Sequence, residues 1–262
     1  MKLHFNMKKD IGLVLSGGGV RSVAHIGLIT VLLENNIIPT HVSGTSGGAL
    51  IGALYASGYE PQEMLNFFKQ TPILKFSLYA FGKPGFLDSA KYQLYFKKFI
   101  KEDAFEKLKY PLTVTATNLI EGKLEYFDSG ELIKPLIASS ALPPVFSPIE
   151  INKNLYCDGG VLNNFPIEPL IDDCDLIIGS FVNALSKIDK SEINSSLKLL
   201  YRVYHLGLDA NNMKKFSKCD YVFVPPDIKN IGVLDSKSID KAFAMGYEYA
   251  KQEEKKIIEA LS

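Results

Sequence analysis

The 262-residue sequence has no net charge and no long run of apolar residues. Its 29 lysines and arginines are balanced by 29 aspartates and glutamates, so no overall charge attracts the chain to nucleic acid or to an anionic membrane. No stretch reaches the roughly 18 uninterrupted apolar residues that a membrane-spanning helix requires. We therefore expect no transmembrane segment and no nucleic-acid partner, and any ligand must be recognised locally.

Cysteine is also scarce. Cys157, Cys174 and Cys219 are an odd number without close spacing, which argues against a disulfide framework and against a zinc site. The N-terminal MKLHFNMKKD is followed by only a short apolar run, IGLVL, and does not have the pattern of a signal peptide. These features predict a cytoplasmic protein whose first residue is either Met1 or Met7.

Apolar residues make up 47% of the chain, which is enough for one large core. Continuous apolar runs that end at glycine or polar residues predict buried strands, and apolar residues three or four apart predict helices. Strands are expected at 11–16, 41–45, 154–158, 175–183 and 220–226 and, as a pair around a turn, within 111–127. Helices are expected at 23–33, 47–57, 131–140, 191–216 and 236–260.

This alternation predicts a three-layer α/β/α fold with a largely parallel central sheet. No repeat, low-complexity block or linker divides the chain. We therefore expect residues 1–262 to form a single domain.

Residues 41–49, HVSGTSGGA, surround one serine with small residues. Gly44, Ser46 and Gly48 satisfy G-x-S-x-G, a strand-to-helix turn that lifts a serine hydroxyl clear of a sheet. The flanking residues must be small because such a turn brings backbone against backbone. A nucleophilic Ser46 is one interpretation, and an ordinary Gly/Ser turn is the other, because short motifs also occur by chance.

The stretch SGGGVRS at 16–22 follows the first strand and opens the first helix, so its backbone N–H groups face an anion above the sheet edge. The oxyanion of an acyl intermediate is the favoured occupant. A nucleotide phosphate is the alternative, although Ser22 replaces the third glycine of the dinucleotide motif. A third interpretation of this stretch is a tight turn that binds no ligand. Arg21 could hold this loop, meet a phosphate or form a surface ion pair.

Asp158 precedes two glycines in CDGGVLNNFP. Asp-Gly is a common hairpin turn, but an activated serine needs a base and Asp158 is well placed to supply it. Partial burial should raise the pKa of this carboxyl towards neutrality. His205 is a rival base, because the order Ser46, Asp158, His205 is that of α/β-hydrolase triads. It lies, however, within the helical pattern LKLLYRVYHLGL, whereas His25 is expected to pack or to bond the backbone.

Taken together, SGGGVRSVAHIG, GTSGG and YCDGGVLNNFP, with SSALPPVFSP before the last, resemble the patatin-like phospholipases over residues 11–170. The resemblance implies a lipid acyl hydrolase that acts on phospholipid, lysophospholipid or another acyl ester without metal or cofactor. Residues 171–262 would complete its sheet and helical layers. Ser22 departs from the glycine that the family commonly has after the arginine. A nucleotide-binding protein and an inactive lipid-binding module are the competing classes.

The site residues that the resemblance implies fall into three groups. The first is a dyad of Ser46 as nucleophile and Asp158 as base. The second is an oxyanion hole formed by the amides of Gly17, Gly18 and Gly19. The third group supports the motifs and comprises Arg21, Gly44, Gly48, Gly159 and Gly160.

The segment 67–89, FFKQTPILKFSLYAFGKPGFLDS, is rich in Phe and Tyr and is interrupted by prolines and glycines. One interpretation is a core helix followed by a loop. The other is a lid that touches the membrane surface, because the segment lacks a sustained helical period. In that case the side chains expected to be partly exposed are Phe76, Leu78, Tyr79, Phe81 and Phe86, with Lys75 and Lys83 meeting head groups.

Overall fold

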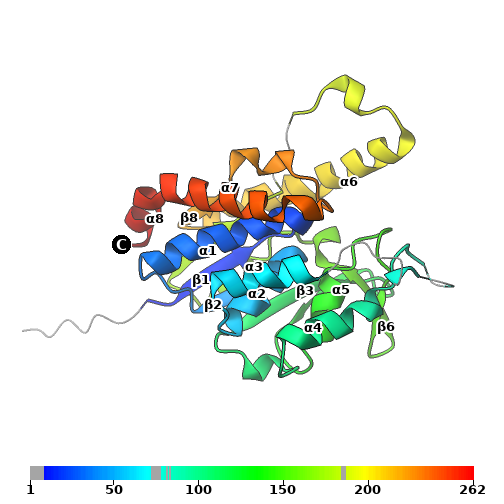
Figure 1. The fold of residues 1–262 in the computed structure, drawn as a ribbon, viewed down its shortest axis with the longest axis horizontal. Coiled ribbons are helices and arrows are strands. Elements are labelled where there is room, and N and C mark those ends of the chain that lie inside the picture. The colour runs from blue at the N-terminus through cyan, green and yellow to red at the C-terminus, as the bar shows by residue number, and fades with distance from the viewer. Residues whose placement is uncertain (1–8, 72–77, 81, 83, 184–186) are drawn as a thin grey trace, which may run out of the picture.

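An eight-stranded sheet forms the centre of the fold in the computed structural model, which describes residues 9–71, 78–80, 82, 84–183 and 187–262 (Figure 1). For seven residues of helix α6 only the backbone is described. The strands are β1 Ile11–Leu15, β2 His41–Gly44, β3 Leu112–Asn118, β4 Lys123–Phe127, β5 Ile149–Ile151, β6 Asn154–Asp158, β7 Leu176–Ser180 and β8 Tyr221–Phe223. The helices are α1 Ala24–Glu34, α2 Gly47–Ala56, α3 Pro61–Gln70, α4 Gln93–Phe99, α5 Ile133–Ser139, α6 Ser196–Asn212, α7 Ile239–Gln252 and α8 Glu254–Leu261.

The strand order is β5-β6-β3-β2-β1-β7-β8, with β4 paired to β3 off this path. Strands β3, β2, β1, β7 and β8 run parallel, whereas β4, β5 and β6 join antiparallel. The centre of the sheet is therefore parallel and one flank is antiparallel. This confirms the predicted fold class.

Both faces of the sheet are covered by apolar clusters. Successive side chains of a strand point to opposite faces, so one strand can contribute to both clusters. Leu13 and Leu15 of β1 join a large core cluster with residues from α1, α2, α3, α5 and α7. Val14 joins a smaller cluster on the other face with Phe165 and Phe181. Short 3-10 turns at 168–170 and 213–218 contribute to this second cluster, which is smaller than the first.

The arrangement around β3 positions the ends of two other strands. Gly44 of β2 and Asp158 of β6 pair with Val114 and Ala116 of β3, respectively. Strand β4 pairs with both of these β3 residues from the opposite side, so β2 and β6 share one edge of β3. Since β2 runs parallel and β6 antiparallel to β3, their C-terminal ends meet head to head along that edge.

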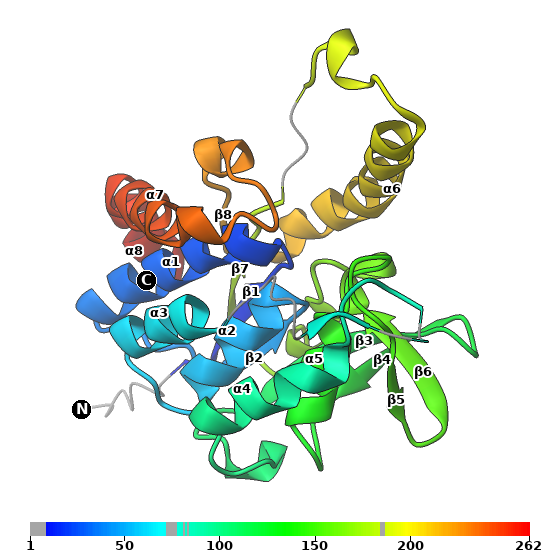
Figure 2. The same ribbon diagram turned by 45° about the vertical axis from the view of Figure 1, so that its right-hand side comes forward.

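Most predicted elements are present, and the differences are local. The predicted helix at 191–216 begins only at Ser196, and the one predicted at 236–260 is divided into α7 and α8 at Glu253. The sequence did not predict α3, α4 or β5. Helix α6 stands out from the rest of the fold in two views (Figures 1 and 2).

Candidate active site

Ser46 lies in a strained turn between β2 and α2. Its φ of 53° and ψ of −127° fall in a region that residues other than glycine rarely occupy. A Cβ atom on Gly44 would lie 2.8 Å from Cα of Ala49, and one on Gly48 would lie 2.3 Å from the carbonyl oxygen of Leu15. The turn brings backbone against backbone, which confirms why the sequence around Ser46 contains only small residues.

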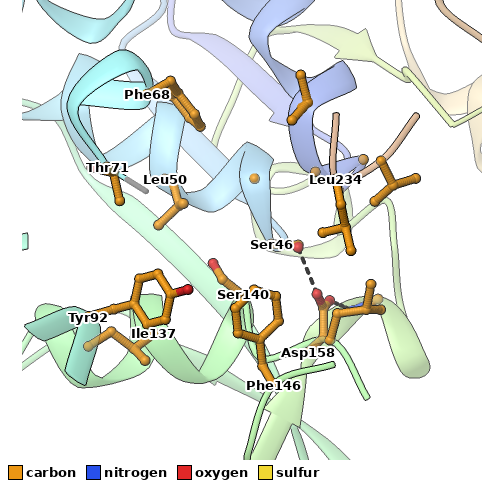
Figure 3. A pocket seen from close by; sticks show the side chains of 18 of the residues that line it. Ser46, Leu50, Phe68, Thr71, Tyr92, Ile137, Ser140, Phe146, Asp158 and Leu234 are labelled. Carbon is orange, nitrogen blue, oxygen red and sulfur yellow. Dashed lines mark hydrogen bonds between the residues drawn. The ribbon is translucent and has the colours of Figure 1, made fainter. Parts of the chain in front are cut away.

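Ser46 and Asp158 are in direct contact. The Oγ of Ser46 donates a hydrogen bond of 2.7 Å to Oδ2 of Asp158 (Figure 3). The two residues are 112 positions apart in sequence and meet because β2 and β6 end head to head on β3. The hydroxyl and the carboxylate are already within hydrogen-bonding distance, which leaves no room for an imidazole between these two groups.

Asp158 is almost completely buried. Burial raises the pKa of its carboxyl from 3.8 to about 6, although the hydrogen bonds from Ser46 and from the Gly160 N–H oppose that rise. The glycine pair after Asp158 allows close packing, because a Cβ on Gly159 would lie 2.4 Å from Oγ1 of Thr115. The direction of this shift agrees with the rise in the carboxyl pKa that partial burial predicted from the sequence.

Further polar side chains hold the serine and aspartate loops in place. Ser139, at the end of α5, accepts the N–H of Ser46 at 2.8 Å. Thr45 donates to the carbonyl oxygen of Asn163 at 3.0 Å and also bonds Thr115 at 2.6 Å. Sequence reasoning did not assign these roles, because threonine and serine in such positions form no recognisable motif. Thr45, Ser139 and Asn163 lie in the stretches GTSGG, SSALPPVFSP and YCDGGVLNNFP, which point to Ser46 and Asp158 and to the family resemblance but not to these supporting bonds.

The glycine loop passes close to Ser46. A Cβ on Gly17 would lie 3.0 Å from Cβ of Ser46, so the loop backbone packs against the serine side chain. Gly17, Gly18 and Gly19 line the same pocket as Ser46 and Asp158. Among the described residues, the N–H groups of these three glycines donate to no protein acceptor. They therefore remain available to a ligand in this pocket.

Arg21 holds the glycine loop against a neighbouring connection. Its Nε donates to the carbonyl oxygen of Ile231 at 2.6 Å, its Nη2 donates to that of Lys229, and its Nη1 donates to Oδ1 of Asn183. The adjacent Val20 N–H also donates to the carbonyl oxygen of Val233 at 2.8 Å. Of the three interpretations of Arg21, the structure supports the one in which it holds the loop.

The departure from the family pattern at Ser22 is a packing feature. The side chain is buried, and its Oγ has no hydrogen-bond partner in the described structure. This oxygen would lie 2.6 Å from a Cβ on Gly47. Ser22 therefore fills space where the glycine loop packs on the start of α2.

His25 and His205 lie in different parts of the fold. His25 is buried, and its Nδ1 and Nε2 lie 2.6 Å from Oγ of Ser180 and 2.9 Å from the carbonyl oxygen of Ser16. Burial lowers its pKa to about 4, so it is a neutral bridge beneath the glycine loop, in agreement with the predicted backbone bond. The backbone of His205 lies within α6, as its helical pattern predicted, and its side chain is not among those described.

An apolar pocket of about 160 Å³ adjoins Ser46 and Asp158. Figure 3 shows Leu50, Ile137 and Phe146 around this space. Other apolar lining residues come from α3, α4 and the start of α7 and are Phe67, Phe68, Phe96 and Ile239. The site therefore combines a polar Ser/Asp pair with walls that suit a hydrocarbon group.

The segment 67–89 is only partly described. Phe67 and Phe68 belong to α3 and line the pocket, and Leu78 is buried, which contradicts its expected exposure. Tyr79 and Phe86 are exposed, as the lid interpretation predicts. The expectations for Phe76, Phe81, Lys75 and Lys83 fall outside the described residues.

The described residues contain neither a metal-binding cluster nor a membrane-spanning helix. In that part of the chain, no cluster of three or more His, Cys, Asp or Glu side chains is arranged to hold a metal ion, and the three cysteines are unpaired. Over the same residues, none of the helices combines the length and the hydropathy needed to cross a bilayer.

Comparison with known sequences identifies relatives. A model of the patatin-like phospholipase family matches residues 13–171. An uncharacterised NTE-family protein from Mycobacterium tuberculosis is 33% identical over 187 residues, which are 70% of this chain and 52% of the relative. Lysophospholipase NTE1 from Coccidioides immitis is 26% identical over 276 residues, or 93% of this chain and 17% of the relative. The chain thus spans about half the length of the mycobacterial relative and under a fifth of the fungal one.

Comparison with solved structures shows the same fold in distant proteins. VipD from Legionella pneumophila superimposes with a TM-score of 0.57 at 16% identity, covering 95% of this chain and 67% of VipD. Human GIVD cytosolic phospholipase A2 gives a TM-score of 0.51 at 9% identity, covering 97% of this chain and 58% of that chain. At these identities the likeness concerns the fold alone.

Proposed function

Because this chain belongs to the patatin-like phospholipase family, we propose that it is a lipid acyl hydrolase that cleaves ester bonds through a Ser46/Asp158 dyad. The observation that carries this proposal is the direct 2.7 Å hydrogen bond from Ser46 Oγ to Asp158 Oδ2 beside an apolar pocket. The bond supplies the nucleophile with its base, and the pocket supplies a place for an acyl chain.

The proposed reaction has two steps. Asp158 accepts the hydroxyl proton as Ser46 Oγ attacks the ester carbonyl, and the proton then passes to the leaving alcohol when the ester bond breaks. Water next attacks the acyl-enzyme carbonyl while Asp158 accepts a proton from it. The bond between the acyl group and Ser46 Oγ then breaks, the proton returns to Oγ, and the fatty acid is released. The N–H groups of Gly17, Gly18 and Gly19, which donate to no acceptor among the described residues, stabilise the oxyanion formed in each step.

We expect Gly18→Val to lower kcat for a short soluble ester by about a hundredfold or more, because the loop amides are then displaced from the oxyanion. The new Cβ would lie 2.8 Å from Cγ2 of Val182, so the loop must shift. Gly207→Val is the matched control, since a Cβ at Gly207 meets nothing within 4 Å. Near-normal turnover by folded Gly18→Val would place the oxyanion hole elsewhere.

Hydrolysis is expected to depend on the ionisation of Asp158, whose pKa burial raises to about 6. The base must be deprotonated, so kcat/KM for a short ester should be constant above this pKa. Below it, the rate should fall about tenfold for each pH unit. A pH–rate profile measures this directly, and a rate that stays constant well below pH 6 would exclude Asp158 as the general base.

For the substrate, we propose a phospholipid or a lysophospholipid, since the fungal relative is named a lysophospholipase. Lipid-class profiling of a membrane-lipid mixture after incubation with purified protein tests this proposal. We expect free fatty acid to accumulate with the deacylated lipid, and neither should form with Ser46→Ala. If lipids are unchanged while a nucleotide binds to the glycine loop, the competing class is correct.

We further propose that the protein works in the cytoplasm as a single domain over residues 1–262 and touches the membrane only peripherally. The unpaired cysteines support a reducing compartment. The exposed Tyr79 and Phe86 support contact between the segment 67–89 and a lipid surface.

A further inference from the structure

Helix α6 exposes an apolar stripe to solvent. Leu199, Leu200, Val203 and Leu206 are 50%, 66%, 56% and 45% exposed, respectively. At 3.6 residues per turn these four positions fall within about 120° of the helix circumference. A stripe of this width usually faces a protein core, but here it faces outward. We refer to these four residues as the α6 stripe.

Residues before and after helix α6 belong to the wall of the candidate active site. Before this helix, the chain leaves the site at Asn183, which lines the pocket and accepts a hydrogen bond from Arg21. After it, Lys215 donates to Oδ1 of Asn163 at 2.7 Å, and the neighbouring Asn164 lines the pocket. The C-terminal end of α6 therefore leads directly to the pocket wall, whereas its first residue, Ser196, is separated from Asn183 by residues 184–195. The helix stands away from the body of the fold (Figures 1 and 2).

Some residues near the α6 stripe or near its anchoring residues are also apolar and exposed, and others are basic. Leu162 and Met213, which lie close in sequence to the anchoring residues Asn163 and Lys215, are also exposed. Lys198 and Arg202 lie along one border of the stripe by helical position. Asp209, in the last turns of α6, is the helix's single acidic residue by sequence. An apolar face bordered by basic residues is the composition of a helix that lies in a lipid interface.

We propose that the α6 stripe docks this protein on the surface of a lipid bilayer. The inference rests on the proposed function, because a lipid hydrolase must bring its pocket to the interface where its substrate lies. Docking through α6 places the pocket rim next to the lipid and buries side chains that otherwise remain in water. A second copy of this chain is the competing occupant, but Ser46, Asp158 and the glycine loop already meet within one chain.

Vesicle binding tests the proposal with Leu200→Ser combined with Val203→Ser. Both changes are made in Ser46→Ala protein, so that vesicles of phosphatidylcholine and phosphatidylglycerol are not degraded. Partitioning measured by co-sedimentation should weaken by about tenfold or more, because two apolar side chains no longer enter the interface. The matched control is Leu94→Ser with Ile258→Ser, which removes two exposed apolar side chains from α4 and α8 and should change binding less than about twofold.

A second measurement uses the absence of tryptophan from this chain. Leu200→Trp introduces a single fluorophore into the α6 stripe, and Leu94→Trp introduces one on α4. Vesicles should shift the emission of the first protein to the blue and leave that of the second unchanged. Equal shifts at both positions, or no shift at Leu200→Trp, would overturn the proposal.

The outcomes separate this inference from the proposed function. With Ser46 restored, the Leu200→Ser/Val203→Ser protein should hydrolyse a short soluble ester at the wild-type rate. A wild-type protein that binds vesicles through the stripe but hydrolyses no ester would refute the function and leave docking intact. Unchanged vesicle binding by the double variant would refute docking. If the wild type is instead a dimer that this variant dissociates, with vesicle binding unchanged, the stripe is an interface between copies.

Discussion

Ser46→Ala is expected to abolish ester hydrolysis, lowering kcat by several orders of magnitude while the fold stays intact. Loss of a covalent nucleophile removes the acyl-enzyme route altogether. The fold should tolerate the change because it removes one oxygen from a turn already surrounded by small residues, and alanine has the same backbone strain at φ 53°. Initial rates with a p-nitrophenyl ester measure the loss.

The control for this variant is structural. Its circular dichroism spectrum and melting temperature should match those of the wild type, since the backbone N–H at position 46 still donates to Oγ of Ser139. A well-folded Ser46→Ala protein that kept more than about a tenth of the activity would exclude Ser46 as the nucleophile.

Asp158→Asn is expected to be as damaging as the loss of the serine, whereas His205→Ala and His25→Ala should retain activity within about tenfold. A nucleophile and its base act as a unit, so removing either one removes most of the rate enhancement. The direct Ser46–Asp158 hydrogen bond leaves no place for an imidazole between them. The comparison of kcat among these folded variants separates a dyad from a triad. An inactive His205→Ala beside an active Asp158→Asn would establish the triad instead.

The same Asp158→Asn change should stabilise the fold at neutral pH. Burial raises the carboxyl pKa from 3.8 to about 6, so the folded state holds this proton more tightly than the unfolded state. The free energy of unfolding therefore falls as pH rises from about 4 to about 6 and stays low above that range. Asparagine removes this cost, for a gain of at most about 3 kcal/mol. A lower melting temperature than the wild type at pH 8 would contradict this expectation.

The sequence predicted the elements that depend on local backbone geometry. The small residues around Ser46 indicated the strand-to-helix turn, and the structure shows the close backbone contacts of Gly44 and Gly48 that require them. The family resemblance is confirmed by the match over residues 13–171. It also indicated which acid residue meets Ser46, although 112 residues separate the two.

What the sequence could not predict depends on contacts between distant segments. No pattern in the sequence indicates that β2 and β6 share one edge of β3, because strand pairing is set by the assembled sheet. The bonds from Arg21 to the carbonyls of Lys229 and Ile231 are equally non-local. The apolar spacing at 191–216 predicted a helix but not the exposure of its apolar residues, since amphipathic spacing does not say what covers the apolar side.

Covalent labelling of the wild-type protein with a fluorophosphonate tests the central claim most directly. The reagent phosphonylates a serine only where a base and an oxyanion hole activate it. Mass spectrometry should find one adduct, on the peptide that contains Ser46, and neither Ser46→Ala nor Asp158→Asn should be labelled. An unlabelled wild type, or an adduct on another serine that persists in Ser46→Ala, would contradict the account.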